Sequence, residues 1–196
     1  MNRNNTPLAD FPTLETPRLV LRELTLADAP ALFAIHGDRS AMRHFGADAM
    51  TQPEQASELI VKFAAWRKAA NPGVRWAIQR KSDGTLVGTC GVFAWNRDWR
   101  KCSTGYELAQ RAWGQGFMRE ALASAFAWAF DAMDLNRIEA QVHPDNAPSL
   151  KLLQGLGFHR EGLLREVGRW NGQFHDLVQL GLLRKDWAPF AGATSS

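Results

Sequence analysis

The sequence predicts an α+β fold in which helices pack on one central, mixed and mostly antiparallel sheet. Two strand-rich stretches, 74–95 and 101–109, follow one another with only short connections, which is typical of an antiparallel meander. A helical pattern at 115–132 then separates the second stretch from a strand-like run at 137–143, and this order predicts a β-α-β crossover. Two further β patterns close the chain, and the layout contains no internal repeat.

Length and composition predict one globular domain with a sizeable core. The chain has 196 residues, of which 45% are hydrophobic. We expect the domain to span 14–186, between a flexible N-terminal arm at 1–13 and a C-terminal tail at 187–196. The net charge of +3 and the pI near 9.1 would help to attract an anionic small molecule. The sequence lacks the clustered Lys and Arg blocks of a dedicated nucleic-acid binder, so nucleic-acid binding is the weakest hypothesis.

Several protein classes are disfavoured by what the sequence lacks. No apolar run approaches the roughly 18 residues of a membrane span, and the first residues contain no apolar signal-peptide core. Cys90 and Cys102 fit neither a disulfide framework nor a metal site, and the five histidines lack metal-ligand spacing. We therefore expect a cytoplasmic protein without a metal and without a membrane partner.

The N-terminal elements are predicted from a strand pattern and two helix-start signals. Residues 18–24 alternate as a strand does. A short helix is expected from Asp28 through Ile35, because an acidic residue with proline in the first turn often begins a helix. Thr51 and Glu54 form a capping-box pattern for a second helix that runs to about residue 70, where Asn-Pro-Gly stops it.

The remaining elements follow from periodicity and turn signals. The turn-rich tetrapeptide 81–84 lies between two strand patterns and predicts a β-hairpin. The helix at 115–132 carries apolar residues at helical spacing, such as Met118, Leu122 and Phe126. The later elements are a strand at 137–143, a short helix at 148–157 and strands at about 158–168 and 174–184.

The stretch RAWGQG, residues 111–116, lies between a predicted strand and a predicted helix. A helix N-terminus has unpaired N–H groups and a partial positive charge, and glycines let a ligand approach the backbone closely, so this stretch could bind a phosphate. It could equally be a tight strand-to-helix turn. A dinucleotide fingerprint would need glycine where Arg119 stands, and no Gly-Lys-Ser/Thr follows for a Walker nucleotide site.

The chain resembles the GNAT N-acetyltransferase superfamily. Arg111-Ala-Trp-Gly114-Gln-Gly116 is similar to the family's acyl-CoA pyrophosphate loop, Gln/Arg-x-x-Gly-x-Gly/Ala. The stretches ETPRLVLREL, GYELAQRAWGQGFMREAL and LNRIEAQVHPDNAPSLKLLQGLGFHREGLLRE resemble the branch that contains the ribosomal-protein alanine N-acetyltransferases. The resemblance covers about residues 14–186.

This resemblance implies the fold in more detail, the co-substrate and its binding residues. The sheet should have helices on both faces, and the strand before the loop and the strand after the long helix should splay apart to admit the pantetheine of acetyl-CoA. Pantetheine would pair with backbone at 106–110, and a backbone N–H near Leu108 or Ala109 would stabilise the oxyanion. The implied acetyl-CoA-binding residues are Leu108, Ala109, Gln110, Arg111, Trp113, Gly114, Gln115, Gly116, Phe117, Met118, Asn146 and Ser149.

Glu107 and Ser149 are the two candidate catalytic residues. Many GNAT enzymes use a tyrosine as the acid for the leaving thiolate, but the single tyrosine, Tyr106, lies on a different strand. Ser149 occupies the region where the alanine-acetyltransferase branch has a serine. Strand alternation sends Glu107 to the face opposite Tyr106 and Leu108, which suits a base for the incoming amine. The alternatives are helix-start roles for Ser149 and Asn146, and for Glu107 a surface carboxylate paired with an arginine.

These features predict transfer of an acetyl group from acetyl-CoA to a primary amine. We favour a protein N-terminal α-amine over a small-molecule amine such as an amino sugar, polyamine or amino acid. An acyl-CoA-binding module without catalysis is the alternative of another class. The acceptor pocket is expected from the first two helices, their loop at 37–48 and the turn at 95–100. A homodimer is compatible with the sequence.

Overall fold

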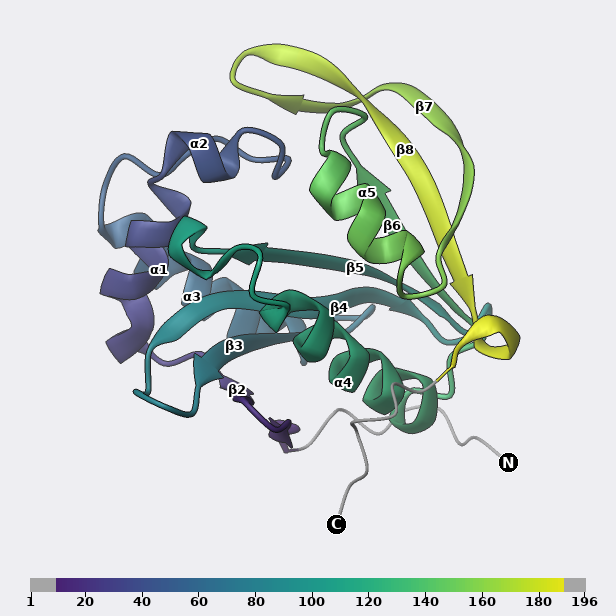
Figure 1. Ribbon diagram of the computed structural model, residues 1–196, viewed down its shortest axis with the longest axis horizontal. Helices are drawn as coiled ribbons and strands as arrows, with labels where there is room; N and C mark the ends of the chain where they lie inside the picture. The colour runs from purple at the N-terminus through teal and green to yellow at the C-terminus, as the bar shows by residue number, and fades with distance from the viewer. Residues whose placement is uncertain (1–9, 189–196) are drawn as a thin grey trace.

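A computed structural model describes residues 10–188, and their strands form one eight-stranded sheet in the order β1-β2-β3-β4-β5-β6-β8-β7 (Figure 1). Neighbouring strands are antiparallel except β5 and β6, which are parallel, so the sheet is mixed and mostly antiparallel as predicted. The strands are β1 Leu14–Glu15, β2 Leu19–Glu23, β3 Val74–Arg80, β4 Leu86–Asn96, β5 Lys101–Leu108, β6 Arg137–Val142, β7 His159–Trp170 and β8 Gln173–Leu183. The helices are α1 Ala29–His36, α2 Arg39–Met42, α3 Glu54–Trp66, α4 Phe117–Ala132 and α5 Ala147–Gln154.

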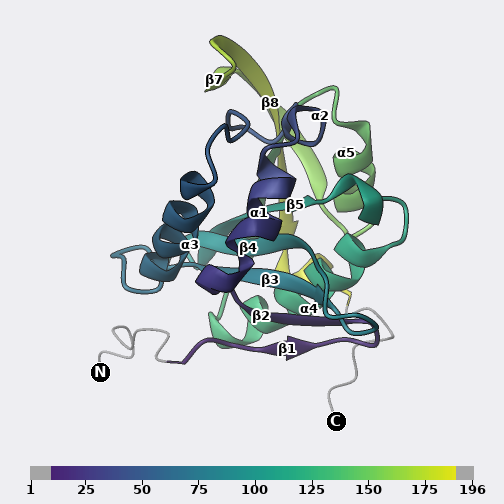
Figure 2. The same ribbon diagram turned by 90° about the vertical axis from the view of Figure 1, so that its left-hand side faces the viewer.

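Helices cover both faces of the sheet, which confirms the expected arrangement. Figure 2 shows α1 and α3 on one side and α5 on the other. Trp76 of β3 is fully buried in the same cluster as Phe126 of α4. The next residue, Ala77, points to the opposite face and packs in a second cluster with Leu32 of α1 and Ile60 of α3. Because side chains alternate along β3, this strand contributes to the hydrophobic clusters on both faces of the sheet.

The start of α3 differs from the prediction. The capping box of Thr51 and Glu54 does not form. The side-chain oxygen of Gln55 instead accepts hydrogen bonds from the backbone N–H groups of Thr51 (2.8 Å) and Gln52 (2.9 Å). Gln55 therefore binds the Thr51 N–H that the Glu54 side chain would bind in a capping box. The helix begins at Glu54 and ends at Trp66, four residues earlier than expected.

The short helix α2 was not predicted. Asp38 caps it, because one carboxylate oxygen accepts from the N–H groups of Ser40 (2.9 Å) and Ala41 (3.2 Å). The loop after α2 reaches the β7–β8 hairpin, where the indole N–H of Trp170 donates to the carbonyl of Arg43 at 3.1 Å. This loop is thereby placed over one end of the sheet.

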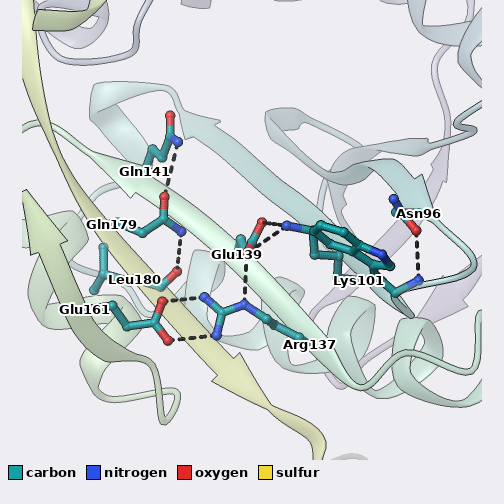
Figure 3. A network of polar contacts seen from close by, with 9 residues as sticks. Asn96, Lys101, Arg137, Glu139, Gln141, Glu161, Gln179 and Leu180 are labelled. Atoms are coloured by element: carbon teal, nitrogen blue, oxygen red, sulfur yellow. Dashed lines mark hydrogen bonds and ion pairs between the residues drawn. The ribbon is translucent and has the colours of Figure 1, made fainter. Parts of the chain in front are cut away.

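Strands β5 and β6 splay apart, as the resemblance implied. They pair only from Lys101 to Ser103, against Arg137 to Glu139. Ion pairs hold this closed end together (Figure 3). The Lys101 ammonium lies 3.2 Å from the Glu139 carboxylate, and Arg137 bonds to both Glu139 (2.9 Å) and Glu161 of β7 (2.7 Å). Beyond Ser103 the strands separate, so these ion pairs lie at the end of the strands from which the gap opens.

The predicted arm and tail fall partly outside the described residues, which exclude 1–9 and 189–196. At the described end of the arm, the indole N–H of Trp76 donates to the Pro12 carbonyl at 2.6 Å, and Phe11 packs edge-on against Trp76. At the start of the tail, Trp187 packs on two aromatic rings of α4, those of Phe126 and Phe130. Within 10–188, no helix combines the length and apolarity needed to span a membrane.

Candidate active site

An open cleft of about 1740 Å³ lies where β5 and β6 part. One part of its wall comes from α3 and the loop after α2, and the other from the loop before α4, the start of α4 and α5. Pockets for single drug-sized ligands usually measure about 300–1,000 Å³. The cleft therefore has room for two substrates at once.

The glycines of the loop before α4 adopt left-handed backbone conformations. Gly114 has φ +72° and Gly116 has φ +78°. A Cβ atom at Gly114 would meet nothing within 4 Å, and one at Gly116 would lie 3.5 Å from Arg18. The backbone conformation thus requires glycine here, and crowding does not. The turn leads directly into α4, whose first N–H groups have no partner within the helix and are presented at the cleft.

Arg18, the residue before β2, holds this loop in place. Its guanidinium donates to the Gln115 carbonyl at 2.9 Å, lies 2.6 Å from the Glu120 carboxylate and stacks 4.6 Å from the centre of the Phe117 ring. Thr16 also donates to Glu120, at 2.6 Å. Burial raises the pKa of Glu120, but the hydrogen bonds from Thr16 and Arg18 outweigh it, so the net pKa is lowered. The sequence carries no signal for this support, because Arg18 lies far away along the chain.

The backbone of β5 directs the N–H of Leu108 toward the gap. The N–H of Ala109 donates to the carbonyl of Val87 at 2.9 Å, so it is engaged with β4. Successive N–H groups of a strand point to opposite sides, and the N–H of Leu108 therefore points away from β4, toward the gap. The indole N–H of Trp113 donates to the Leu108 carbonyl at 2.9 Å and ties the loop to the strand.

Tyr106 and Ser149 meet across the gap. The phenol oxygen of Tyr106 lies 2.7 Å from the hydroxyl oxygen of Ser149 on α5. Burial raises the pKa of Tyr106 well above its usual value, although the bond with Ser149 lowers it. Tyr106 was set aside because of its strand, yet its hydroxyl lies beside Ser149. The signal that could have revealed this is the predicted β-α-β crossover, which places the start of α5 above β5.

Asn146 caps α5, which is the helix-start role given above as the alternative to acetyl-CoA binding. Its side-chain oxygen accepts from the backbone N–H of Ser149 at 3.2 Å. Asn146 and Ser149 both line the cleft, so the cap also lies within reach of a bound ligand.

Glu107 lies on the opposite face of β5 in a buried polar cluster. Its carboxylate accepts hydrogen bonds from the Thr89 hydroxyl and the Arg75 guanidinium, and it lies 3.2 Å from Nε2 of His36. The predicted alternation of faces is confirmed. The predicted arginine partner is present, but the carboxylate is not on the surface, because only 8% of Glu107 is exposed.

The environment of Glu107 keeps it ionised. Burial raises the pKa of the carboxyl group, but the Arg75 charge, the His36 contact and the Thr89 hydrogen bond together bring it below its usual range. An α-ammonium group has a pKa of about 7.7–8.0, so its proton would move uphill by more than about 3 pKa units, or about 4 kcal/mol, to reach this carboxylate. Glu107 is therefore a weak base at neutral pH.

Most of the predicted site residues are brought together in the cleft. Those that line it are Glu107, Leu108, Trp113, Gly114, Gly116, Phe117, Met118, Asn146 and Ser149. Ala109, Gln110, Arg111 and Gln115 do not line it. They support the loop from behind, because Gln110–Ala112 form a 3₁₀ turn and the Gln115 amide donates to the Arg111 carbonyl at 2.8 Å.

The acceptor-side predictions are half right. The loop at 37–48 lines the cleft, together with aromatic residues such as Phe45, Phe63 and Trp66. The turn at 95–100 does not line the cleft, and that prediction was wrong. It joins β4 to the end of β5 at which β5 and β6 are paired, whereas the cleft opens at the other end. Among residues 10–188, no group of three or more His, Cys, Asp or Glu side chains could hold a metal ion.

Comparisons with known proteins agree with this geometry. Residues 18–159 match the model of the acetyltransferase (GNAT) domain family. The uncharacterized N-acetyltransferase YoaA of Bacillus subtilis is 39% identical over 166 residues, which cover 85% of this chain and 93% of that protein. The [ribosomal protein uS5]-alanine N-acetyltransferase of Escherichia coli is 36% identical over 88 residues, 45% of each chain. The structure of Mycobacterium smegmatis RimJ in complex with CoA-disulfide superposes with a TM-score of 0.77 at 24% identity, over 87% of each chain.

Proposed function

The chain belongs to the GNAT acetyltransferase family, and from that premise we propose that it acetylates a protein N-terminal α-amine with acetyl-CoA. It is an acyl-CoA-dependent N-acetyltransferase, and the class of acceptor is the part proposed. The observation that carries the proposal is the arrangement of β5 in the cleft. Tyr106 and Leu108 face the thioester side, and Glu107 faces the acceptor side.

The residues around the gap suit acetyl-CoA. Its pantetheine amides would pair with the open edge of β5, as an added strand does. Its pyrophosphate would lie on the N–H groups of Gly114 to Met118, where the glycines permit close approach and the α4 dipole favours negative charge. The Trp113 N–H, which the sequence also suggested, donates to the Gln110 carbonyl at 3.0 Å instead. Asn146 lies on the other wall of the same part of the cleft. Ala109, Gln110, Arg111 and Gln115 would act by shaping the loop.

The chemistry is a direct attack in a ternary complex. The amine nitrogen attacks the thioester carbon, and the Leu108 N–H stabilises the oxyanion that forms. The carbon–sulfur bond then breaks with its electron pair on sulfur, and the nitrogen, which is positively charged after the attack, releases one proton to solvent or to the thiolate. Thiols have a pKa of about 8.5 and the Tyr106 pKa lies above the ordinary tyrosine value, so a full proton transfer from Tyr106 to the thiolate is unfavourable. One hydroxyl of the Tyr106–Ser149 pair donates to the other, and the remaining O–H stabilises the thiolate by donating a hydrogen bond.

The acceptor side favours an α-amine over a lysine. Removing the proton from an α-ammonium at pH 7 costs about 1 kcal/mol, whereas a lysine, with a pKa of about 10.4, costs nearly 5 kcal/mol. Glu107 is a weak base because its pKa is lowered, so the easier deprotonation matters. The local similarity to a ribosomal-protein alanine N-acetyltransferase supports the same class.

Thiol release from acetyl-CoA tests the proposal. We expect release with peptides that have a free N-terminal alanine, and none with the same peptides blocked at the N-terminus but carrying an internal lysine. Release only with polyamines, amino sugars or free amino acids would move the acceptor to the small-molecule class. Acetyl-CoA binding by calorimetry without release for any acceptor would identify a non-catalytic acyl-CoA-binding module.

A further inference from the structure

His36 is a buried titratable residue at the acceptor side of the cleft. It is the last residue of α1, and 3% of it is exposed. Its ring packs edge-on against Phe45 with the centroids 5.2 Å apart, and it is one of the residues that line the cleft. The histidine therefore borders the cleft next to the weak base Glu107.

The contact with Glu107 determines which ring nitrogen of His36 carries hydrogen. The carboxylate already accepts from Thr89 and Arg75, so it is an acceptor, and Nε2 of His36, at 3.2 Å, must donate to it. In a neutral imidazole the other nitrogen, Nδ1, is then the acceptor. Within residues 10–188, no side chain or backbone group donates to Nδ1, and this atom is not among the fully buried polar atoms that lack a partner. Nδ1 is thus not fully buried, and His36 lines the cleft.

We propose that His36 is the proton acceptor for the amine substrate and that Glu107 is its positioning residue. This rests on the proposed function. One N–H bond of the acceptor ammonium breaks and its proton passes to Nδ1, directly or through one water, while the nitrogen keeps the electron pair that attacks the thioester. The imidazolium that forms is stabilised by the Glu107 anion and by the C-terminal end of α1, and it loses its proton to solvent after acetyl transfer.

The charges around His36 are mixed. Glu107 is in direct contact, and Arg75 lies behind it and offsets part of its effect. The other charged side chains on this part of the cleft are Arg43 and Asp48 from the loop after α2, and Glu58 and Lys62 from α3. Because Glu107 is the one anion in contact with His36 and the other charges balance, the Glu107 carboxylate determines the orientation of the imidazole.

The pH dependence of kcat/KM for His36→Asn, with a peptide α-amine as acceptor, tests the proposal. At pH 7 we expect a loss of about five- to tenfold, the factor by which an α-amine with a pKa of about 7.7–8.0 is depleted in its neutral form. The loss should nearly vanish at pH 9, because the acceptor then arrives already neutral. Acetyl-CoA affinity should not change. The matched control is His159→Asn, an exposed histidine of β7 outside the cleft, which should behave as wild type.

A loss that is constant from pH 6 to 9, or no loss, would overturn the assignment and leave His36 a packing role. If His36→Asn does not fold, ¹⁵N NMR of the wild-type imidazoles decides the matter. A neutral Nε2–H tautomer near pH 8 supports the proposal, whereas an Nδ1–H tautomer or a ring that stays charged to pH 9 refutes it. A wild-type enzyme that releases no thiol with any acceptor refutes the proposed function instead, which keeps the two failures distinct.

Discussion

Replacing Gly116 by valine should weaken acetyl-CoA binding while the fold persists. The residue has φ +78°, and a non-glycine residue in the left-handed region costs about 1–2 kcal/mol, more when it is β-branched. The nearest atom to a new Cβ is 3.5 Å away on Arg18, an ordinary contact, so no clash adds to this cost. For a chain of 196 residues, a loss of about 1–2 kcal/mol lowers Tm by roughly 2–8 °C.

The effect on acetyl-CoA binding is separate from this loss of stability. If the loop leaves the left-handed conformation, the N–H groups at the start of α4 no longer converge on the pyrophosphate. We expect at least a tenfold rise in Kd, about 1.4 kcal/mol, by calorimetric titration with acetyl-CoA. Gly172 in the β7–β8 turn is the matched control, since it has φ +74° and no atom within 4 Å of a new Cβ. Unchanged affinity for Gly116→Val, or an equal loss for Gly172→Val, would refute the assignment of the loop.

Two further predictions concern the two faces of β5. Ser149→Ala should lower kcat by about 10- to 100-fold across pH 6 to 9, because thiolate departure does not depend on the proton of the acceptor. Pre-steady-state measurement of acetyl transfer checks this. An unaffected rate would leave Ser149 with a helix-start role only. Glu107→Gln should lower the free energy of unfolding by about 3–5 kcal/mol at pH 7, because it leaves Arg75 buried without its anion. The folded pKa of Glu107 is lowered, so this stabilisation is present above the unfolded pKa of about 4.3 and is lost as pH falls through the folded value. The gap in Tm between wild type and variant should therefore narrow below about pH 4, and a gap constant with pH would contradict the ion-pair account.

Much of the fold could be predicted because its signals are local. The turn of the 74–95 hairpin and the helical periodicity of 115–132 depend on neighbouring residues, and both elements are present. The capping box failed for a local reason too, because the Gln55 side chain accepts from the Thr51 N–H in place of the Glu54 side chain. The sequence pattern alone does not determine which of two neighbouring side-chain acceptors a backbone N–H will bind.

Only the site residues that are consecutive in the sequence, on β5 and in the loop before α4, could be predicted. Glu107 was identified by alternation along one strand. Its partners His36 and Arg75 come from α1 and β3 and meet it only after the sheet has formed. The support that Arg18 gives to the loop, from just before β2, could not be predicted for the same reason. Such contacts depend on the order of strands in the sheet, which no local pattern encodes.

The function of β5 depends on its register in the sheet. Three consecutive residues, Tyr106 to Leu108, supply a hydroxyl on one face, a carboxylate on the other and an N–H in the edge between β5 and β6. A slip of one residue would exchange the two faces and direct the Leu108 N–H toward β4. The ion pair between Lys101 of β5 and Glu139 of β6 lies at the closed end, only a few residues before the reactive segment. Ion pairs near the surface contribute little to stability, about 0–1 kcal/mol each. The role of this pair is therefore better explained by alignment, since it joins β5 to β6 where the strands last pair before the gap opens.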